Sequence, residues 1–302
     1  MDNENEFKAG FAAVIGRPNV GKSTLMNTLL GQKVAAVSPR PQTTRKQQLG
    51  ILTLDDAQII FTDTPGIHKV KHKLGGYMNE EATLALEESD LIMFVVDASE
   101  QPTEEDLMIA GLVNKLRSTP VLLLVNKIDL VGKEQQENRA AAFQDLVPAA
   151  DLVMVSALDG ANIAGLVDKI TSLLPENPPF FPPDQVTDSY ERDIAADLIR
   201  ESALVLLRDE VPHGIAIRMD EYTERGDIGA YIEATIFVER ESQKGIVIGE
   251  NGNMIKLIST RAREEIEKMS GRKVFIRLRV KVRKNWRNDD RALQLFGFKG
   301  KG

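Results

Sequence analysis

The sequence predicts an α/β domain with a doubly wound, mostly parallel sheet, followed by a smaller α+β domain. Three observations lead to this prediction. Residues 8–173 repeat a pattern of short apolar run, turn and helix-length amphipathic segment, residues 175–183 contain five prolines, and a different order of elements follows them. A chain of 302 residues is long enough for two domains that each bury a sizeable core.

Five nearly continuous apolar runs predict strands that are covered on both faces, as in a parallel sheet. They lie at residues 11–15, 59–62, 91–96, 121–125 and 152–155. The segments between them, such as 104–116 and 163–174, are long enough for crossover helices. Because such sheets bind ligands beyond the carboxyl ends of their strands, the residues after each run are candidates for a site.

The prolines are compatible with neither a helix nor a central strand. We therefore interpret residues 175–184 as a semi-rigid linker between a first domain, 1–174, and a second domain, 185–302. The second domain is predicted to have the order α-β-β-α-α-β. Its elements are expected at residues 189–208, 215–221, 231–238, 253–269 and 273–282, with a short helix at 289–295.

The composition, 42% apolar and 27% charged, is that of an ordinary soluble protein. The absence of cysteine excludes thiol catalysis, disulfides and cysteine-based metal sites, and three histidines leave little for an imidazole metal centre. The acidic start is not typical of a secretory signal, and no apolar run approaches the roughly 20 residues that cross a bilayer. We therefore expect a cytoplasmic protein.

The net charge of −7 conceals a strong asymmetry along the chain. Residues 240–302 carry 17 Lys and Arg against 7 Asp and Glu, a balance of +10. The remaining residues carry 21 basic and 38 acidic side chains, a balance of −17. An acidic body with a basic end favours a polyanion-binding module attached to another activity, with a merely solvated charged surface as the alternative.

Residues 16–23 match the phosphate-binding pattern G-x-x-x-x-G-K-[ST], between a predicted strand and a helix-compatible segment. The glycines let backbone N–H groups turn toward an anion, and the helix N-terminus adds partial positive charge. Lys22 is expected to reach the β- and γ-phosphates, and the Ser23 hydroxyl to join a Mg²⁺ shell. The predicted phosphate-binding residues are Gly16, Arg17, Pro18, Asn19, Val20, Gly21, Lys22, Ser23 and Thr24.

Two further segments extend this predicted site. In Asp63-Thr64-Pro65-Gly66, the aspartate follows a strand and is expected to hold the metal through water, while the Gly66 N–H would face a γ-phosphate. Residues 42–45 read Gln-Thr-Thr-Arg, and a threonine there would close over the nucleotide by binding Mg²⁺. We favour Thr44, with Thr43 as the alternative.

Residues 126–129, Asn-Lys-Ile-Asp, are predicted to select the base. The Asp129 carboxylate can accept hydrogen bonds from both N1–H and the exocyclic amine of guanine, a donor pair that adenine lacks. Asn126 is expected to support the loop and Lys127 to cover the face of the base. The backbone of Ser156 and Ala157, after another strand, is expected to reach guanine O6.

These segments look like the motifs of a translation-factor-related GTPase. Lys22, Thr44 and Gly66 are then the predicted catalytic residues, and Ser23, Thr44 and Asp63 the predicted metal ligands. Ile67, also predicted to contact the nucleotide, stands where Ras-like GTPases carry the glutamine that orients the attacking water, so intrinsic hydrolysis should be slow. Relatives with such a replacement use a phosphate-loop asparagine to help bind K⁺, which the resemblance places at Asn19.

The second domain contains Gly249-Glu250-Asn251-Gly252, a G-x-x-G loop between helix-like stretches. In a K-homology (KH) fold this loop clamps the backbone of about four nucleotides. Downstream, basic residues alternate with aliphatic ones along a predicted strand, which favours a polyanion surface on one face. Trp286, the only tryptophan, is expected to cap the core, with stacking on a base as the alternative. The basic residues of this strand are Arg277, Arg279, Lys281 and Arg283.

From GRPNVGKST, QTTR, DTPG and NKID to VIGENG and KVRKNW, nearly the whole chain resembles the Era-like GTPase family. The resemblance implies a GTPase domain followed by a KH type II domain that binds small-subunit (16S) ribosomal RNA near its 3′ end. It also implies GTP, GDP and Mg²⁺ as ligands, a role in 30S subunit maturation and some peripheral attachment to the inner face of the cell membrane. The loop lacks a lysine common in the family, which leaves more of the RNA contact to Lys256, Arg261 and Arg263.

Two alternatives are weighed against this interpretation. A GTPase that assists tRNA modification should carry a helical modification domain and often a C-terminal cysteine, and the sequence shows neither. A plain RNA-binding protein with a vestigial phosphate loop is disfavoured by the intact Lys22, Ser23, Asp63, Asn126 and Asp129. No obligate protein partner is evident.

Overall fold

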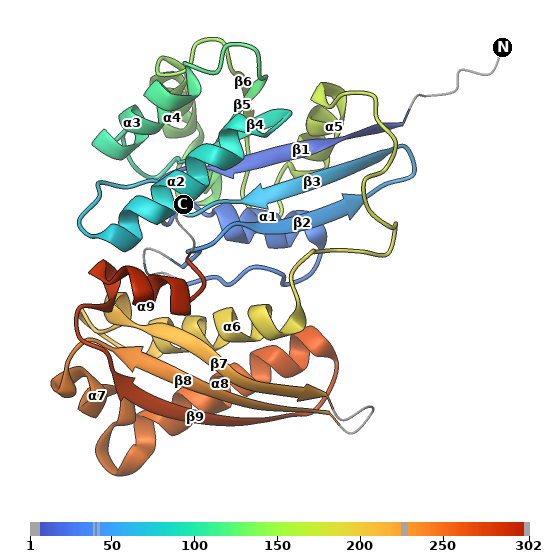
Figure 1. The fold of residues 1–302 in the computed structure, drawn as a ribbon. Helices are drawn as coiled ribbons and strands as arrows, with labels where there is room; N and C mark the ends of the chain where they lie inside the picture. Colours follow the sequence, from blue (N-terminus) through green and yellow to red (C-terminus); the bar gives the residue numbers. More distant parts are fainter. Residues whose placement is uncertain (1–6, 39, 41–42, 225–228, 299–302) are drawn as a thin grey trace. The chain divides into compact units, whose positions relative to one another are not determined.

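The computed structural model describes residues 7–38, 40, 43–224 and 229–298 (Figure 1). Contacts divide the chain into two compact units. The first comprises the described parts of Met1–Ala35, Thr44–Lys69 and Met78–Asp188, and the second those of Ala36–Thr43, Val70–Tyr77 and Ser189–Gly302. Two short segments of the N-terminal half therefore belong to the second unit, which the sequence-based division at residues 174 and 184 does not anticipate.

The first unit is built on a six-stranded sheet in the order β2-β3-β1-β4-β5-β6. All neighbouring strands are parallel except β2, which runs antiparallel to β3. The doubly wound, mostly parallel sheet predicted from the sequence is therefore confirmed. The strands are β1 (Lys8–Ile15), β2 (Gln48–Thr53), β3 (Ala57–Asp63), β4 (Leu91–Asp97), β5 (Val121–Asn126) and β6 (Asp151–Met154).

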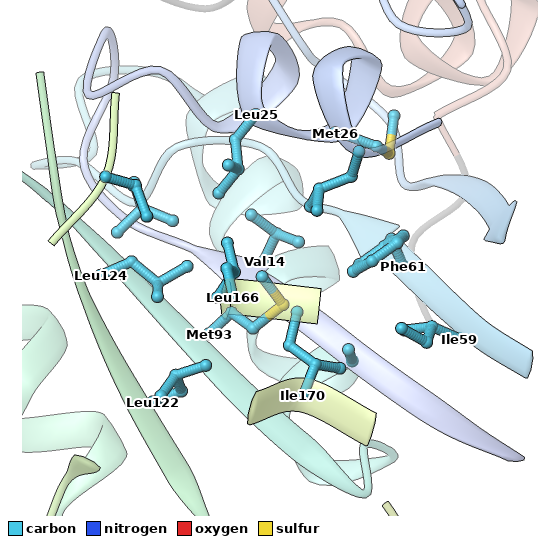
Figure 2. Close-up of a cluster of buried hydrophobic side chains, with 14 of the residues drawn as sticks. Val14, Leu25, Met26, Ile59, Phe61, Met93, Leu122, Leu124, Leu166 and Ile170 are labelled. Atoms are coloured by element: carbon cyan, nitrogen blue, oxygen red, sulfur yellow. The ribbon is translucent and has the colours of Figure 1, made fainter. Parts of the chain in front are cut away.

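Helices cover both faces of this sheet (Figure 1). α1 (Lys22–Leu30) and α5 (Ile163–Leu173) pack on one face, where Leu25, Phe61 and Ile170 belong to one buried cluster (Figure 2). Burial of each large apolar side chain there contributes about 1.5–3 kcal/mol to the free energy of folding, which stabilises the sheet that carries the site. The opposite face is covered by α2 (Lys73–Glu87), α3 (Glu104–Val113) and α4 (Lys133–Gln144).

The proline-rich segment is hydrogen-bonded to the first unit rather than free-standing. The Pro175 carbonyl accepts a hydrogen bond at 3.1 Å from the N–H of Ala9, a residue of β1. Further along, the side-chain oxygen of buried Gln58 accepts from the N–H groups of Phe180 and Phe181 at 2.8 and 3.0 Å. These bonds restrict the segment more than its proline content alone would.

The second unit contains a three-stranded sheet in the order β7-β8-β9. β7 (Ala216–Glu224) and β8 (Ala230–Val238) are antiparallel, whereas β8 and β9 (Val274–Val282) are parallel. The predicted order α-β-β-α-α-β is confirmed. The helices of this unit are α6 (Glu191–Leu206), α7 (Glu241–Ile248), α8 (Asn253–Ser270) and α9 (Asp290–Leu295).

Helices α6 and α8 cover one face of this smaller sheet (Figure 1). Leu198 from α6, Ile232 from β8 and Ile266 from α8 meet in its core. Trp286 is fully buried and its indole N–H donates to the Gly214 carbonyl at 2.8 Å, which confirms its predicted place in the core. Short 3₁₀ helices lie at Ile128–Leu130, Pro212–Gly214, Glu250–Gly252 and Trp286–Asn288.

Among the helices of the described residues, none combines the length and the apolar character needed to span a membrane.

Candidate functional site

The loop between β1 and α1 ends at Gly21, which caps the helix with φ +101°. A Cβ at Gly21 would lie 2.3 Å from the side-chain nitrogen of Asn126, so both backbone conformation and space require glycine. The described helix α1 has no acidic residue in its first turn and no side-chain cap at its N-terminus. Its first N–H groups and its positive end are therefore suited to an anion.

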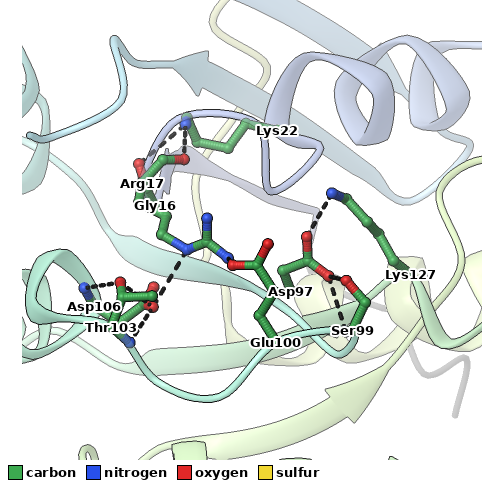
Figure 3. A network of polar contacts seen from close by, with 9 residues as sticks. All are labelled: Gly16, Arg17, Lys22, Asp97, Ser99, Glu100, Thr103, Asp106 and Lys127. Carbon is green, nitrogen blue, oxygen red and sulfur yellow. Dashed lines mark hydrogen bonds and ion pairs between the residues drawn. The ribbon is translucent and has the colours of Figure 1, made fainter. Parts of the chain in front are cut away.

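Lys22 is buried at the start of α1, and its side chain folds back over this loop. Its ammonium donates to the carbonyl oxygens of Gly16 and Arg17, each at 3.0 Å (Figure 3). Burial lowers the pKa of Lys22 to about 8, although the nearby Asp63 carboxylate acts in the opposite direction. The lysine is thus placed where the β- and γ-phosphates of a nucleotide are expected.

Three oxygens from separate segments meet beside this lysine. The Ser23 and Thr44 hydroxyls donate to the same carboxylate oxygen of Asp63, at 2.8 and 3.0 Å, and lie 2.9 Å from each other. Mg²⁺ prefers oxygen ligands of this kind and usually keeps waters and substrate phosphates as its other ligands. The donor set therefore fits the predicted metal.

The structure also separates the two threonines that the sequence left open. Thr44 lies at the oxygen cluster, whereas the Thr43 hydroxyl donates to the Arg40 carbonyl at 2.8 Å and lies 3.0 Å from the Ser38 hydroxyl. The geometry thus favours Thr44, as predicted. Gln42 of the same segment lies outside the described residues.

The segment after β3 packs directly on the phosphate loop. The Thr64 hydroxyl donates to the Val14 carbonyl at 2.8 Å, and a Cβ at Gly66 would lie 2.8 Å from the Pro18 nitrogen. The side chain of Ile67 is buried in the core beside α2, so only its backbone is available for the predicted nucleotide contact.

Asn126 joins three of the predicted nucleotide loops. Its side-chain nitrogen donates to the Val20 carbonyl at 2.8 Å, and its oxygen accepts from the Ala157 N–H at 2.9 Å. Asp129 is exposed, and one of its carboxylate oxygens accepts from the Ser156 hydroxyl at 2.6 Å. The predicted base-selecting residues are therefore brought together at the carboxyl ends of β5 and β6.

Sequence reasoning missed Asp97, which closes β4 and holds Lys127 (Figure 3). The Lys127 ammonium lies 2.5 Å from the Asp97 carboxylate, and Ser99 donates to the same group. Burial would raise the pKa of Asp97, but these hydrogen bonds outweigh it and lower the pKa below its ordinary value. The available signal was position, since Asp97 ends its strand as Asp63 ends β3.

Arg17 of the phosphate loop is tied to the start of α3 (Figure 3). Its guanidinium lies 2.6 Å from Glu100 and 3.3 Å from the buried Asp106 carboxylate. Asp106 and Thr103 also form a reciprocal capping box at the N-terminus of α3. The arginine therefore positions the phosphate loop against a rigid helix end.

The G-x-x-G loop of the second unit is more open than the phosphate loop. Gly249, Asn251 and Gly252 all have positive φ, at 75°, 51° and 77°. A Cβ at Gly249 would lie 2.7 Å from the Met254 backbone, but no described atom lies within 4 Å of one at Gly252. With exposed Glu250 and Asn251 between the glycines, the loop leaves room for a backbone to approach the start of α8.

The predicted basic strand alternates as expected, but its cations lie away from this loop. The aliphatic residues of β9 face α8, so Arg277, Arg279 and Lys281 lie on the opposite face of the sheet. Lys256, in contrast, lies in the first turn of α8, next to the loop, and Arg261 lies further along the same helix. The predicted RNA-binding residues therefore lie on two faces of the same unit, and the β9 cations share one face as predicted.

Several of these cations are also paired. Glu233 on β8 lies 3.3 Å from Arg277 and 2.9 Å from Arg279, and Arg283 lies 3.5 Å from Asp289. The two pairs with Glu233 depend on the register between β8 and β9, which local sequence patterns do not specify.

Fold and site together define a P-loop GTPase unit joined to a KH unit. Two family models match, "50S ribosome-binding GTPase" over residues 11–127 and "KH domain" over residues 210–287. A crystal structure of Era with MgGDPNP and nucleotides 1506–1542 of 16S ribosomal RNA is similar with a TM-score of 0.92. It is 41% identical over 97% of this chain and 99% of that chain. A point variant of Aquifex aeolicus Era bound to GDP and AlF₄⁻ matches with the same values. The chain belongs to the Era family of GTPases.

Proposed function

We propose that this protein is a GTP-hydrolysing switch that binds 16S ribosomal RNA near its 3′ end and acts in assembly of the 30S subunit. The main support is that one chain combines an assembled nucleotide site with a KH loop, as does the Era protein that holds MgGDPNP and 16S RNA. The family description that mentions the 50S subunit matches residues 11–127 alone. We favour the small subunit because the RNA-bound relative matches both units.

In the proposed reaction, water attacks the γ-phosphate and GDP leaves. Lys22 and the N-terminus of α1 stabilise the charge that develops on the phosphate oxygens, and the Gly66 N–H supports the γ-phosphate. Mg²⁺, held by Ser23 and Thr44 with Asp63 behind them, would supply further charge neutralisation. Since Ile67 offers no side-chain group to orient water, intrinsic hydrolysis is slow.

We also propose that K⁺ accelerates turnover through Asn19, an exposed residue of the phosphate loop. A monovalent cation beside the phosphates would stabilise transition-state charge where no arginine does so. Hydrolysis should then be faster in K⁺ than in Na⁺ buffer, and Asn19→Ala should remove the difference. Equal rates for the original protein in the two buffers would exclude this role.

The switch requires that RNA bind the GTP form and the GDP form with different affinity. Thr44 is the candidate sensor, because its hydroxyl is hydrogen-bonded to Asp63 and Ser23 and would turn to the metal with GTP. Equal RNA affinity for the two forms, with unchanged GTP turnover, would contradict the coupling.

Crosslinking tests the RNA partner directly. The protein is loaded with a slowly hydrolysed GTP analogue, crosslinked to RNA in a cell extract, and the bound RNA is sequenced. Enrichment of the 3′ end of 16S RNA is expected, with Asp129→Asn protein as the control for nucleotide loading. Recovery of tRNA or messenger RNA instead would overturn the assignment of 16S RNA as the partner.

For localisation, we expect the protein in the cytoplasmic fraction of the same extract, with a small share on the inner membrane.

A further inference from the structure

The face of the KH sheet that points away from its helices carries a stacked aromatic pair, of which Phe275 is exposed and Tyr231 half-buried. Tyr231 on β8 and Phe275 on β9 are register partners, and their rings lie 7° from parallel with centroids 5.5 Å apart. Phe275 is 62% exposed, although a large apolar side chain is usually covered. Nucleic-acid bases stack on flat aromatic rings of this kind.

The cations next to this pair are held in place by one carboxylate. Glu233 accepts from the Tyr231 hydroxyl and pairs with both Arg277 and Arg279. The hydrogen bond from Tyr231, together with the two arginines, lowers the pKa of Glu233. Two guanidinium groups carry ten N–H donors, more than one carboxylate can use. Tyr231 and the arginines are therefore pre-positioned while donors remain for a ligand.

The charge of this face favours a polyanion at the β9 edge. Outward-facing Arg277, Arg279 and Lys281 meet no acidic residue on β9 itself. The acidic Asp220 and Glu221 lie on the β7 side, where Asp220 is bonded to Arg218 and Thr235 and Glu221 is the register partner of Glu233. At the far end of the face, Phe296 packs over Phe237, so the open aromatic surface lies at Phe275.

We propose that this outer face, centred on Phe275, is a second binding surface for single-stranded RNA. A base stacks on Phe275, and Arg277, Arg279 and Lys281 bind the adjoining phosphates. The proposal rests on the proposed function for the identity of the RNA as ribosomal. A G-x-x-G loop clamps about four nucleotides, so a longer strand needs a further surface of this kind.

The test measures affinity of the full chain, loaded with a GTP analogue, for two fluorescent single strands of equal length by anisotropy. One is the 3′-terminal segment of 16S RNA and the other is oligoadenylate. Phe275→Leu, which keeps an apolar side chain but removes the ring, should weaken binding of both about tenfold, because stacking tolerates any base. Phe275→Trp should restore it.

Tyr190→Leu is the matched control, because Tyr190 is an aromatic residue of the same unit that is 78% exposed and lies at the start of α6. It should leave both affinities within about twofold. Replacing Arg277 and Arg279 by Gln should weaken RNA binding. The slope of log affinity against log salt concentration should become shallower by about two, one for each lost phosphate contact. Circular dichroism checks that each variant is folded.

Glu233→Gln tests whether Glu233 positions the two arginines. Arg277 and Arg279 then lose their common ionic partner, so RNA binding should weaken, and tighter binding would contradict this positioning. The proposal is overturned if Phe275→Leu binds both RNAs as the original protein does, even when it loses affinity for 30S subunits, which would indicate a protein partner. If the original protein shows no preference for 16S RNA over oligoadenylate, the proposed function fails. A loss of affinity for both RNAs in Phe275→Leu would still support the outer face as an RNA-binding surface.

Discussion

The phosphate loop and the G-x-x-G loop use the same backbone device in different surroundings. In each, a glycine with positive φ directly precedes a helix, Gly21 before α1 and Gly252 before α8. Around Gly21 the space is filled by Asn126, and the neighbouring Lys22 and Asp63 are buried. Around Gly252 the space is open and the neighbouring side chains are exposed.

This difference matches two kinds of ligand. Buried groups in fixed positions act strongly on a compact charge, because little water screens them and no reorganisation is needed. An open loop instead lets a long polymer approach, and affinity then depends on many weak, salt-sensitive contacts. The same local sequence solution can therefore serve catalysis in one unit and recognition in the other.

The largest expected effect comes from the base-selecting carboxylate. Asp129→Asn should weaken GTP binding by about 100-fold or more, because the guanine donors lose their acceptor. Binding of xanthosine triphosphate should improve, since an amide can donate to the carbonyl that xanthine has at that position. Titration calorimetry with both nucleotides measures this, with the exposed Asp159→Asn as control. Unchanged GTP affinity would instead support the alternative of an RNA-binding protein with a vestigial phosphate loop.

The two glycines should differ when each is replaced by alanine. Both variants strain a positive φ, at a cost of about 1–2 kcal/mol in the free energy of unfolding. Gly21→Ala must also displace the Asn126 side chain, so it should be destabilised further and lose at least about tenfold in GTP affinity. Gly252→Ala should show the strain alone in urea unfolding. Equal losses in the two variants would show that surroundings are unimportant.

Lys22 predicts a pH dependence for the nucleotide site. Its pKa of about 8 means that the ammonium loses its proton above pH 8 in the nucleotide-free protein. GTP affinity should therefore fall up to about tenfold between pH 7 and pH 9, with proton uptake on binding at the higher pH. Lys22→Met should bind weakly with no such dependence. Calorimetry in buffers of different ionisation enthalpy detects the proton.

The lowered pKa of Lys22 has the opposite effect on the stability of the nucleotide-free protein, which should increase with pH where GTP affinity decreases. The folded pKa is about 8 and the unfolded value is 10.5, so the unfolded chain binds more protons between these pH values. The contribution of Lys22 to the free energy of unfolding should thus rise as pH increases from 8 to 10.5. Lys22→Met, compared with the original protein in denaturant titrations over this window, should lack that rise.

The smallest expected effect tests the open loop. Glu250→Lys places a cation where the loop now has a carboxylate, and RNA affinity should increase a few-fold at low salt, with a steeper salt dependence. Glu241→Lys, an exposed change of the same charge at the start of α7, is the control for net charge. Equal gains in both variants would mean that the loop itself is not the contact.

Much of the nucleotide site could be predicted because each of its parts is local. The glycine turn, the residues that end β3 and β5, and the helix start at Lys22 are all visible in short segments in the right order. Asp97 was missed because a single aspartate after a strand has no motif of its own. Strand β2 was missed because Gln48 and Gly50 interrupt its apolar pattern and it pairs at the sheet edge.

The sequence by itself determined the order of elements, the phosphate loop, the base-selecting loop and the charge of the basic end, since these depend on spacing and side-chain chemistry. Only the tertiary structure decided that Thr44 rather than Thr43 meets Asp63, that Lys127 is held by Asp97, and that the cations of β9 face away from the G-x-x-G loop. Each of these depends on contacts between residues far apart in the chain. Such contacts follow from strand register and helix packing, which local patterns do not specify.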